Sequence, residues 1–272
     1  MIQQQTKENP MEIEKEYVYA SLKELKVRHF PGVIEEGLKL QDPKRQSETI
    51  GLLKRACEKE KSERKTMRIA SKVKSAKFRQ IQTAETFDFG HSKLTQRIEK
   101  TYLSIHNNVD KDNLPKAIFV GNPGVGKTHL ARSLGYASCQ KGLSVLFLTA
   151  AEMANSLLQA LKLAQLDREF ARLKKPQVLI IDELGYVDFD VQGSQLFFQV
   201  ISARHDAGLG LVVTTNLNFS QFNQIFANEA VATVVVDRMV NEAEIFYMEG
   251  ESYRKHQRAM KTKTGKSESS SK

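Results

Sequence analysis

The sequence of 272 residues predicts an α/β fold with a doubly wound parallel sheet, preceded by a small α-helical domain. Three observations predict it. From Ala117 onward, apolar runs typical of buried strands alternate with helical stretches, and this series implies a parallel sheet covered on both faces. A glycine-rich loop separates the first such run from a helix. Before residue 80 the pattern is helical and strongly basic.

The first part of the chain is expected to contain only helices. After about ten polar residues, short helices are predicted over residues 13–40, broken at Pro31 and Gly32 and ended near Asp42 and Pro43. A long helix is predicted from Ser47, as its N-cap, to about Lys77. The sequence therefore predicts a helical domain over residues 1–79 and a linker over residues 80–90.

The second part is expected to be the sheet domain, over residues 91–260. Its strands and helices follow from the alternation of buried runs with helical stretches. The predicted strands are 117–121, 144–149, 177–182 and 210–215, with one more possible at 245–248, and the predicted helices are 126–141, 151–173 and 192–205. Residues 261–272 are rich in Lys and Ser and are expected to be a disordered tail.

Charge is distributed unevenly along the chain, which has a formal net charge of +9. The segment from Lys44 to Arg79 contains 13 Lys and Arg against 4 Asp and Glu, and the segment from Arg254 onward is also basic. Such asymmetry suggests a polyanionic partner such as nucleic acid. The alternative is that both segments are simply solvated, well-charged surfaces.

Composition also indicates where the protein works. No apolar run approaches the 18 or more residues of a membrane span, and the first residues lack a signal peptide's apolar stretch. Cys57 and Cys139 are the only cysteines, so a disulfide framework is not expected. We therefore expect a cytoplasmic protein with no membrane partner.

The glycine-rich loop fits the phosphate-binding pattern G-x-x-x-x-G-K-[ST]. Its glycines let successive backbone N–H groups converge on an anion at a helix N-terminus. Lys127 is expected to reach the β- and γ-phosphates, and the Thr128 hydroxyl to bind Mg²⁺. The strand before the loop and the helix after it favour this interpretation over an ordinary glycine-rich turn. The predicted nucleotide-binding residues are Gly121, Asn122, Pro123, Gly124, Val125, Gly126, Lys127, Thr128 and His129.

Polar side chains follow two later strands. Asp182 and Glu183 end an apolar run, and ligands of open α/β sheets bind at the carboxyl ends of the strands. Asp182 fits a residue that holds Mg²⁺, and Glu183 a general base for an attacking water. Asn216 follows another buried strand, and could position the water or simply occupy a turn.

Two arginines, Arg238 and Arg254, could stabilise negative charge on a γ-phosphate, although a surface arginine is the ordinary alternative. No other chemistry is indicated. The six histidines show no metal-ligand spacing, no Cys-x-x-Cys occurs, and no Ser/His/Asp nucleophile signature is found.

Together these motifs give a family resemblance. The chain resembles the IstB-type helper ATPases of bacterial transposons, relatives of the DnaC helicase loader in the AAA+ superfamily. The resemblance spans nearly all of residues 20–258 and depends on the order of the motifs more than on any one of them. The motifs are GNPGVGKTHLA (121–131), LIIDELGY (179–186), LFFQVIS (196–202), TTN (214–216), DRMV (237–240), GESYR (250–254) and the basic segment ending AKFRQIQTAETFDF (76–89).

The resemblance implies roles that the pattern alone left open. Asn216 would be sensor 1, Arg254 would be sensor 2, and Arg238 would be an arginine finger acting on a neighbouring subunit's ATP. It also implies an ATPase that assembles into homo-oligomers on double-stranded DNA with ATP and Mg²⁺, deforms the DNA, and presents it to a DDE-type transposase. The basic residues expected to contact DNA are Arg64, Lys65, Arg68, Lys72, Lys74, Lys77 and Arg79.

Two other functions compete with this one. A helicase loader would share the ATPase core but would grip a replicative helicase and prefer single strands. A nucleotide-gated scaffold would bind ATP and barely hydrolyse it, although Glu183 argues against this because scaffolds often lose that acid.

Overall fold

The computed structural model describes residues 10–250, 252 and 253. The chain divides into two compact units, one ending at Arg68 and the other beginning at Ile69. The division therefore lies before the sequence-based boundary at residue 79. The reason is that Val73, Ala76 and Phe78 pack into the core of the sheet and so belong to the second unit.

From residue 10 onward, where its structure is described, the first unit consists of helices and the turns between them. The helices are α1 (Pro10–Glu24), α2 (Phe30–Lys39) and the start of α3 (Pro43–Ser75), which runs across the unit boundary. Six buried side chains form its small core: Val18, Leu22, Leu25, Leu38, Ile50 and Cys57.

Two boundaries predicted for this unit are wrong. Pro31 and Gly32 lie in the first turn of α2 and do not break it. The long helix α3 begins at Pro43, so Ser47 lies inside it and is not its N-cap. Proline suits the first turn, where its missing N–H would have had no helical partner. The chain turns instead at residues 25–29, where Lys26 adopts a left-handed conformation with φ of 60°.

The second unit contains a five-stranded sheet in the order β2-β3-β4-β1-β5, with every pair parallel. The predicted α/β fold with a parallel sheet is thereby confirmed, and the possible fifth strand is real. The strands are β1 (Lys116–Gly121), β2 (Val145–Thr149), β3 (Val178–Asp182), β4 (Gly210–Thr215) and β5 (Glu244–Met248). Because all strands run the same way, their carboxyl ends meet at one edge, which we call the carboxyl edge, and their starts meet at the amino edge.

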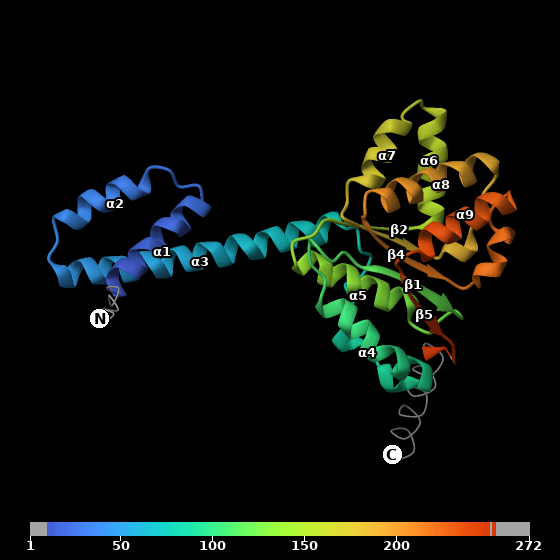
Figure 1. Cartoon of the computed structure of the whole chain (residues 1–272), viewed down its shortest axis with the longest axis horizontal. Helices are drawn as coiled ribbons and strands as arrows, with labels where there is room; N and C mark the ends of the chain where they lie inside the picture. The colour runs from blue at the N-terminus through green and yellow to red at the C-terminus, as the bar shows by residue number, and fades with distance from the viewer. Residues whose placement is uncertain (1–9, 251, 254–272) are drawn as a thin grey trace, which may run out of the picture. The chain divides into compact units, whose positions relative to one another are not determined.

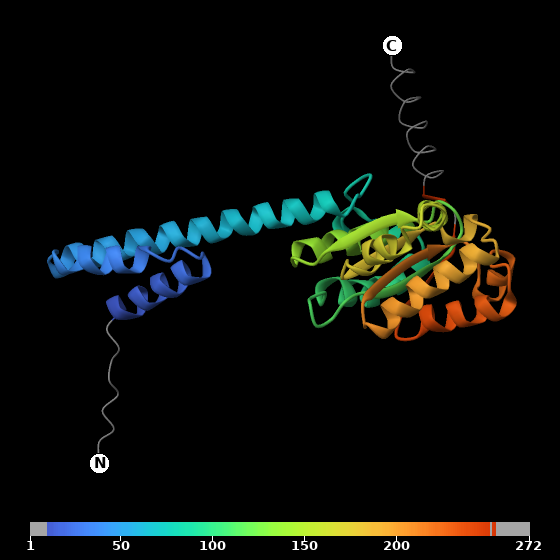
Figure 2. The ribbon, with the colours of Figure 1, turned by 90° about the horizontal axis from the view of Figure 1, so that it is seen from above.

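Helices cover both faces of the sheet (Figures 1 and 2). Alternate side chains of each strand enter one of two cores: Phe119 and Ile180 face one, and Ile118 and Ile181 face the other. The first core is shared with α4 (Lys93–Asn107) and α5 (Lys127–Gln140). The second core is shared with α6 (Ala150–Lys162), α7 (Leu166–Lys174), α8 (Val191–Asp206) and α9 (Glu229–Val240). Four short 3₁₀ turns complete the unit: η1 (Ala84–Thr86), η2 (Phe89–His91), η3 (Leu184–Tyr186) and η4 (Phe219–Gln224).

Two segments of this unit differ from their prediction. The single helix expected over residues 151–173 is two helices, α6 and α7, because Ala164 adopts a left-handed conformation with φ of 53°. Neither glycine nor proline marks that break. The segment 80–90 is not a loose linker, since Ala84 and Phe89 are buried in the core beside α5. The sequence predicted a linker because residues 80–90 are rich in polar side chains, and the pattern does not show that Ala84 and Phe89 are buried.

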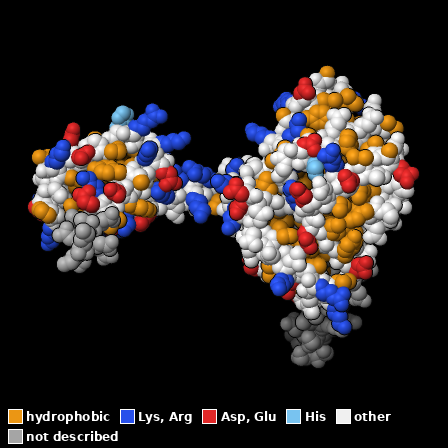
Figure 3. All heavy atoms as spheres, in the orientation of Figure 1, with side chains coloured by type: hydrophobic (Ala, Val, Ile, Leu, Met, Phe, Trp, Pro, Cys, Tyr) orange, Lys and Arg blue, Asp and Glu red, His pale blue; other side chains and the backbone are white. Residues whose placement is uncertain are grey.

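Within the described residues, no helix is long and apolar enough to cross a membrane. The same part of the chain contains no cluster of three His, Cys, Asp or Glu that could hold a metal ion. Lys and Arg side chains gather along the C-terminal half of α3, as Figure 3 shows.

Candidate nucleotide-binding site

The glycine-rich loop joins the end of β1 to the start of α5 at the carboxyl edge of the sheet. Gly126 is the N-cap residue of α5 and has φ of 102°, a conformation that side chains disfavour. A Cβ atom there would also lie 2.4 Å from the ring of Phe87. Glycine is therefore required at this position both by backbone conformation and by the space available.

The Lys127 side chain folds back and hydrogen-bonds to the backbone of the loop. Its Nζ donates hydrogen bonds to the carbonyl oxygens of Gly121, at 2.6 Å, and Asn122, at 2.8 Å. The ammonium group thus lies within the loop whose backbone is expected to bind phosphates. A cation in this position, beside the positive end of the α5 dipole, favours an anionic ligand.

Thr128 and Asp182 meet as the sequence predicts. The Thr128 hydroxyl donates to Oδ1 of Asp182 at 2.9 Å, and Asp182 is only 2% exposed. The Thr214 hydroxyl donates to the same carboxylate oxygen from the neighbouring strand β4. Hydroxyl and carboxylate oxygens are the donors that Mg²⁺ prefers. The residues present therefore fit a magnesium ion, which Thr128 and Asp182 would hold and which would neutralise phosphate charge.

Glu183 follows Asp182 in a left-handed conformation with φ of 62°. Its backbone N–H donates to the Thr214 hydroxyl at 3.0 Å, while the residue itself is exposed. Such a strained conformation in a residue other than glycine is common at functional sites. Thr214 thus ties the acidic end of β3 to β4, a role that the sequence analysis missed, although Thr214 stands in the TTN motif.

Asn216 lies at the end of β4, between the strands that carry the loop and the acidic pair. Its Oδ1 is buried and has no hydrogen-bond partner among the described residues. A Cβ atom added to Gly185 would lie 2.1 Å from that oxygen, so the backbone of η3 presses against the Asn216 amide. Packing therefore holds this amide in place, and its unpartnered oxygen can accept a hydrogen bond from a ligand or a water.

The segment predicted as a linker forms one wall of the site. The His129 ring contacts the Thr83 carbonyl oxygen at 2.9 Å through Nε2, and the Phe87 ring packs edge-on against it. Burial lowers the pKa of His129, so this ring is neutral at pH 7, and its Nε2–H donates to Thr83. On another side, the Tyr253 backbone N–H donates to the Gly124 carbonyl oxygen at 3.1 Å. The loop is therefore enclosed by segments distant in sequence, which no local pattern could predict.

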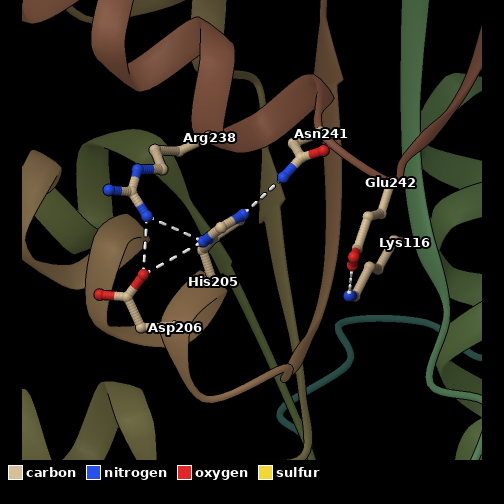
Figure 4. Close-up of polar contacts among 6 residues, drawn as sticks. All are labelled: Lys116, His205, Asp206, Arg238, Asn241 and Glu242. Atoms are coloured by element: carbon tan, nitrogen blue, oxygen red, sulfur yellow. Dashed lines mark hydrogen bonds and ion pairs between the residues drawn. The ribbon is translucent and has the colours of Figure 1, made fainter.

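Arg238 lies at the opposite edge of the sheet, and Figure 4 shows the polar contacts around it. It contacts His205 and Asp206, which end α8 just before β4 begins, and the adjacent Glu242 pairs with Lys116, the first residue of β1. Since β1 has six residues, the start of the strand lies about 17 Å from the phosphate loop at its end. The structure therefore does not bring Arg238 together with the other predicted site residues of its own chain.

The remaining predicted residues fall into three groups. Arg254 lies outside the described residues. Two basic residues are bound within the protein: Arg64 donates to Glu60 and the Leu25 carbonyl, and Arg79 to Glu152. Lys65 and Arg68 in the first unit, and Lys74 and Lys77 in the second, are exposed, while Lys72 is half-buried.

The sheet, the loop at its carboxyl edge and the Thr128–Asp182 pair define a P-loop nucleotide-binding protein of α/β architecture. Its fold is similar to that of the DnaC helicase loader, with a TM-score of 0.52 and 20% identity over 58% of this chain and 91% of that structure.

Sequence comparison gives the family. The family of IstB-like ATP-binding proteins matches residues 20–261, so the chain belongs to it. The ATP-binding protein of insertion sequence IS5376 from Geobacillus stearothermophilus is 33% identical over 201 residues, which cover 74% of this chain and 78% of that relative. The ATP-binding protein of insertion sequence IS21 from Pseudomonas aeruginosa is 29% identical over 233 residues, or 86% of each chain. The resemblance drawn from the motifs is thereby confirmed.

Proposed function

We propose that this protein is an ATPase that assembles on double-stranded DNA and delivers it to a DDE-type transposase. Membership of the IstB-like family and the insertion-sequence names of the relatives support the link to transposition. The protein would act in the cytoplasm, on chromosomal DNA. The observation that carries the proposal is that the phosphate loop and Arg238 stand at opposite edges of one sheet.

The carboxyl edge would bind and hydrolyse ATP. Lys127 and the backbone of the loop would bind the β- and γ-phosphates, and Thr128 with Asp182 would hold Mg²⁺. Glu183 would accept a proton from the attacking water, and Asn216 would orient that water or contact the γ-phosphate through its amide. The exposed carboxylate and the unpartnered amide oxygen at these positions support the two roles.

The amino edge would complete the site of another subunit. Arg238 is too far from its own loop to stabilise charge there, yet two of its nitrogens have no hydrogen-bond partner among the described residues. An arginine supplied by a neighbouring subunit stabilises the transition state of phosphoryl transfer. Hydrolysis would then need a homo-oligomer, with Arg254 as a second contact to the nucleotide of its own subunit.

The basic residues would supply the DNA contacts. The exposed side chains of Lys65, Arg68, Lys74 and Lys77 support this role, since none of the four forms a salt bridge within the described residues. Arg64 and Arg79 would contribute less, because each already donates to an acid of its own unit. Contacts with phosphates release counterions, so binding should weaken steeply as salt rises.

Binding of a fluorescent 50-base-pair duplex tests the proposal. Affinity should be higher with a non-hydrolysed ATP analogue than with ADP, and should fall as salt rises from 50 to 200 mM, by about 10-fold or more. Charge reversal at Lys65 and Arg68 should weaken binding, and reversal at Lys111, an exposed lysine far along the sequence, is the matched control.

Equal binding with ATP analogue and ADP would contradict the proposal. Preference for single strands, together with capture of a replicative helicase, would favour a helicase loader. A transposase that shows no change in target use when the protein and ATP are added would remove the delivery role.

A further inference from the structure

Within the described residues, Arg238 is held by one of its three guanidinium nitrogens. Nη1 donates to Oδ1 of Asp206 at 2.7 Å and contacts Nδ1 of His205 at 2.9 Å. Among the described residues, no hydrogen-bond partner exists for Nε or Nη2, and Figure 4 shows Nη2 pointing away from the cluster. The side chain is one-third exposed, at 33%. The guanidinium is therefore oriented by its own subunit while two of its nitrogens stay accessible.

His205 is itself fixed. Nδ1 of His205 lies 2.9 Å from Nη1 of Arg238 and 3.2 Å from Oδ1 of Asp206, so this one ring nitrogen contacts both members of the ion pair. On the other side of the ring, Nε2 lies 2.8 Å from Nδ2 of the Asn241 amide. The charged groups around the ring are Asp206 on α8, Arg238 on α9, and the ion pair of Glu242 with Lys116. The ring is thus clamped on both nitrogens.

The end of α8 that carries this pair is anchored from inside the protein. Arg204 is fully buried, with 0% exposure, and its guanidinium donates to four backbone carbonyl oxygens, at 2.6 to 3.3 Å. These carbonyls belong to Leu173, Pro176, Gln177 and Gly210. Because Arg204 ties the end of α7 and the starts of β3 and β4 together, the next two residues have a rigid base.

The contacts of Arg238 are poorly explained as a stabilising ion pair. The Asp206 side chain is 63% exposed, and exposed pairs contribute little to stability. A clamp of this kind does reduce the many rotamers that an arginine otherwise samples. Prior orientation of this sort matters where a charged group must meet a reacting phosphate in one geometry.

We infer that His205 and Asp206 are positioning residues: they hold Arg238 by Nη1 and present Nε and Nη2 to a nucleotide bound by a neighbouring copy of this chain. The inference rests on the proposed function, because it assumes that Arg238 acts between subunits. It adds two residues that neither touch the nucleotide nor belong to the motifs quoted for the family resemblance.

The test compares turnover with ATP affinity in protein assembled on duplex DNA. Asp206→Ala and His205→Leu should each lower kcat by about 10- to 100-fold, because a misplaced arginine no longer meets the phosphate. ATP affinity and melting temperature should stay as in the wild type, since neither residue is in the nucleotide site. His205→Asn, which keeps an acceptor near the position of Nδ1, should recover most of the turnover.

Two controls distinguish a positioning role from a general disturbance of the structure at this edge. Glu242→Gln breaks the ion pair with Lys116 at the same edge and should leave kcat unchanged. Asp206→Ala added to Arg238→Ala should cause no further loss, because the residue acts only through Arg238. If Asp206→Ala fails to fold, Asp206→Asn, which keeps the shape and removes the charge, takes its place.

Different results would overturn the positioning role of His205 and Asp206 and the proposed role of Arg238. If Arg238→Ala cripples turnover while the His205 and Asp206 variants retain the wild-type rate, the positioning inference is overturned and the proposed function stands. Faster turnover in those variants would also overturn it, since the pair would then restrain Arg238 and not present it. If Arg238→Ala itself retains the wild-type rate, the proposed role between subunits is wrong.

Discussion

The polar side chains at the two edges of the sheet differ in how fully they are hydrogen-bonded within the chain. At the carboxyl edge, Lys127 donates hydrogen bonds to the loop backbone, and the Thr128 hydroxyl donates to Asp182. At the amino edge, Arg238 is engaged through Nη1, and its other two guanidinium nitrogens have no hydrogen-bond partner in the part of the chain that the structure describes. The first edge is organised around a ligand of its own. In the proposed function the second edge offers a group outward, so that one subunit would carry halves of two different sites.

The largest effect is expected at the carboxyl edge. Lys127→Ala should remove detectable ATP binding, a loss of about 2–3 kcal/mol or more, because the charge-assisted bonds to phosphate disappear. ATP-dependent assembly should be lost with it. Isothermal titration with ATP and Mg²⁺ measures the first, and light scattering the second. Retained affinity would mean that the loop does not bind phosphate.

The next effect concerns stability at the amino edge. Arg204→Met should lower the free energy of unfolding by about 3 kcal/mol, because buried carbonyl oxygens lose their donors. Burial lowers the pKa of Arg204 to about 10, because the charged guanidinium has lost most of its hydration. Urea denaturation checks the prediction. Exposed Arg97 on α4 provides the matched control: Arg97→Met should change stability by less than about 0.5 kcal/mol.

A smaller effect is expected from crowding Asn216. Gly185→Ala would place a methyl group against the Asn216 amide, which has to move, and turnover should fall by about 10-fold with ATP affinity retained. Steady-state hydrolysis and nucleotide titration measure the two quantities. Gly37→Ala on α2 is the control, because this glycine has open space around it and no positive φ. An unchanged kcat for Gly185→Ala would remove Asn216 from the reaction.

The smallest effect is a dependence of stability on pH. Burial lowers the pKa of His129 in the folded state, so the unfolded state binds protons more readily. Its contribution to stability is therefore present above the ordinary histidine pKa of about 6.5 and is lost as the pH falls below it. His129→Gln should reduce this decline between pH 7 and 5, by less than about 1 kcal/mol. Urea midpoints across that range measure it, and an identical decline in the variant would contradict the assignment.

The sequence predicted those parts of the fold and site that depend on neighbouring residues. The phosphate loop, the acidic end of β3 and the buried strands each occupy a continuous stretch with its own pattern. The break at Ala164 was not predictable, because an alanine gives no local signal that its backbone is left-handed. Thr214, Phe87 and the His205–Asp206 pair were missed for a related reason: their partners come from other elements, and only the folded chain brings them together.

The central claim is that each site needs an arginine from another subunit. Glu183→Gln keeps Arg238 but lacks the proposed base, and Arg238→Ala keeps the base but lacks the arginine. Each variant alone should be nearly inactive when assembled on DNA. An equal mixture should recover up to about a quarter of wild-type turnover, the fraction of head-to-tail interfaces that combine both intact halves. A mixture no more active than its components, or full activity of Arg238→Ala alone, would contradict the account.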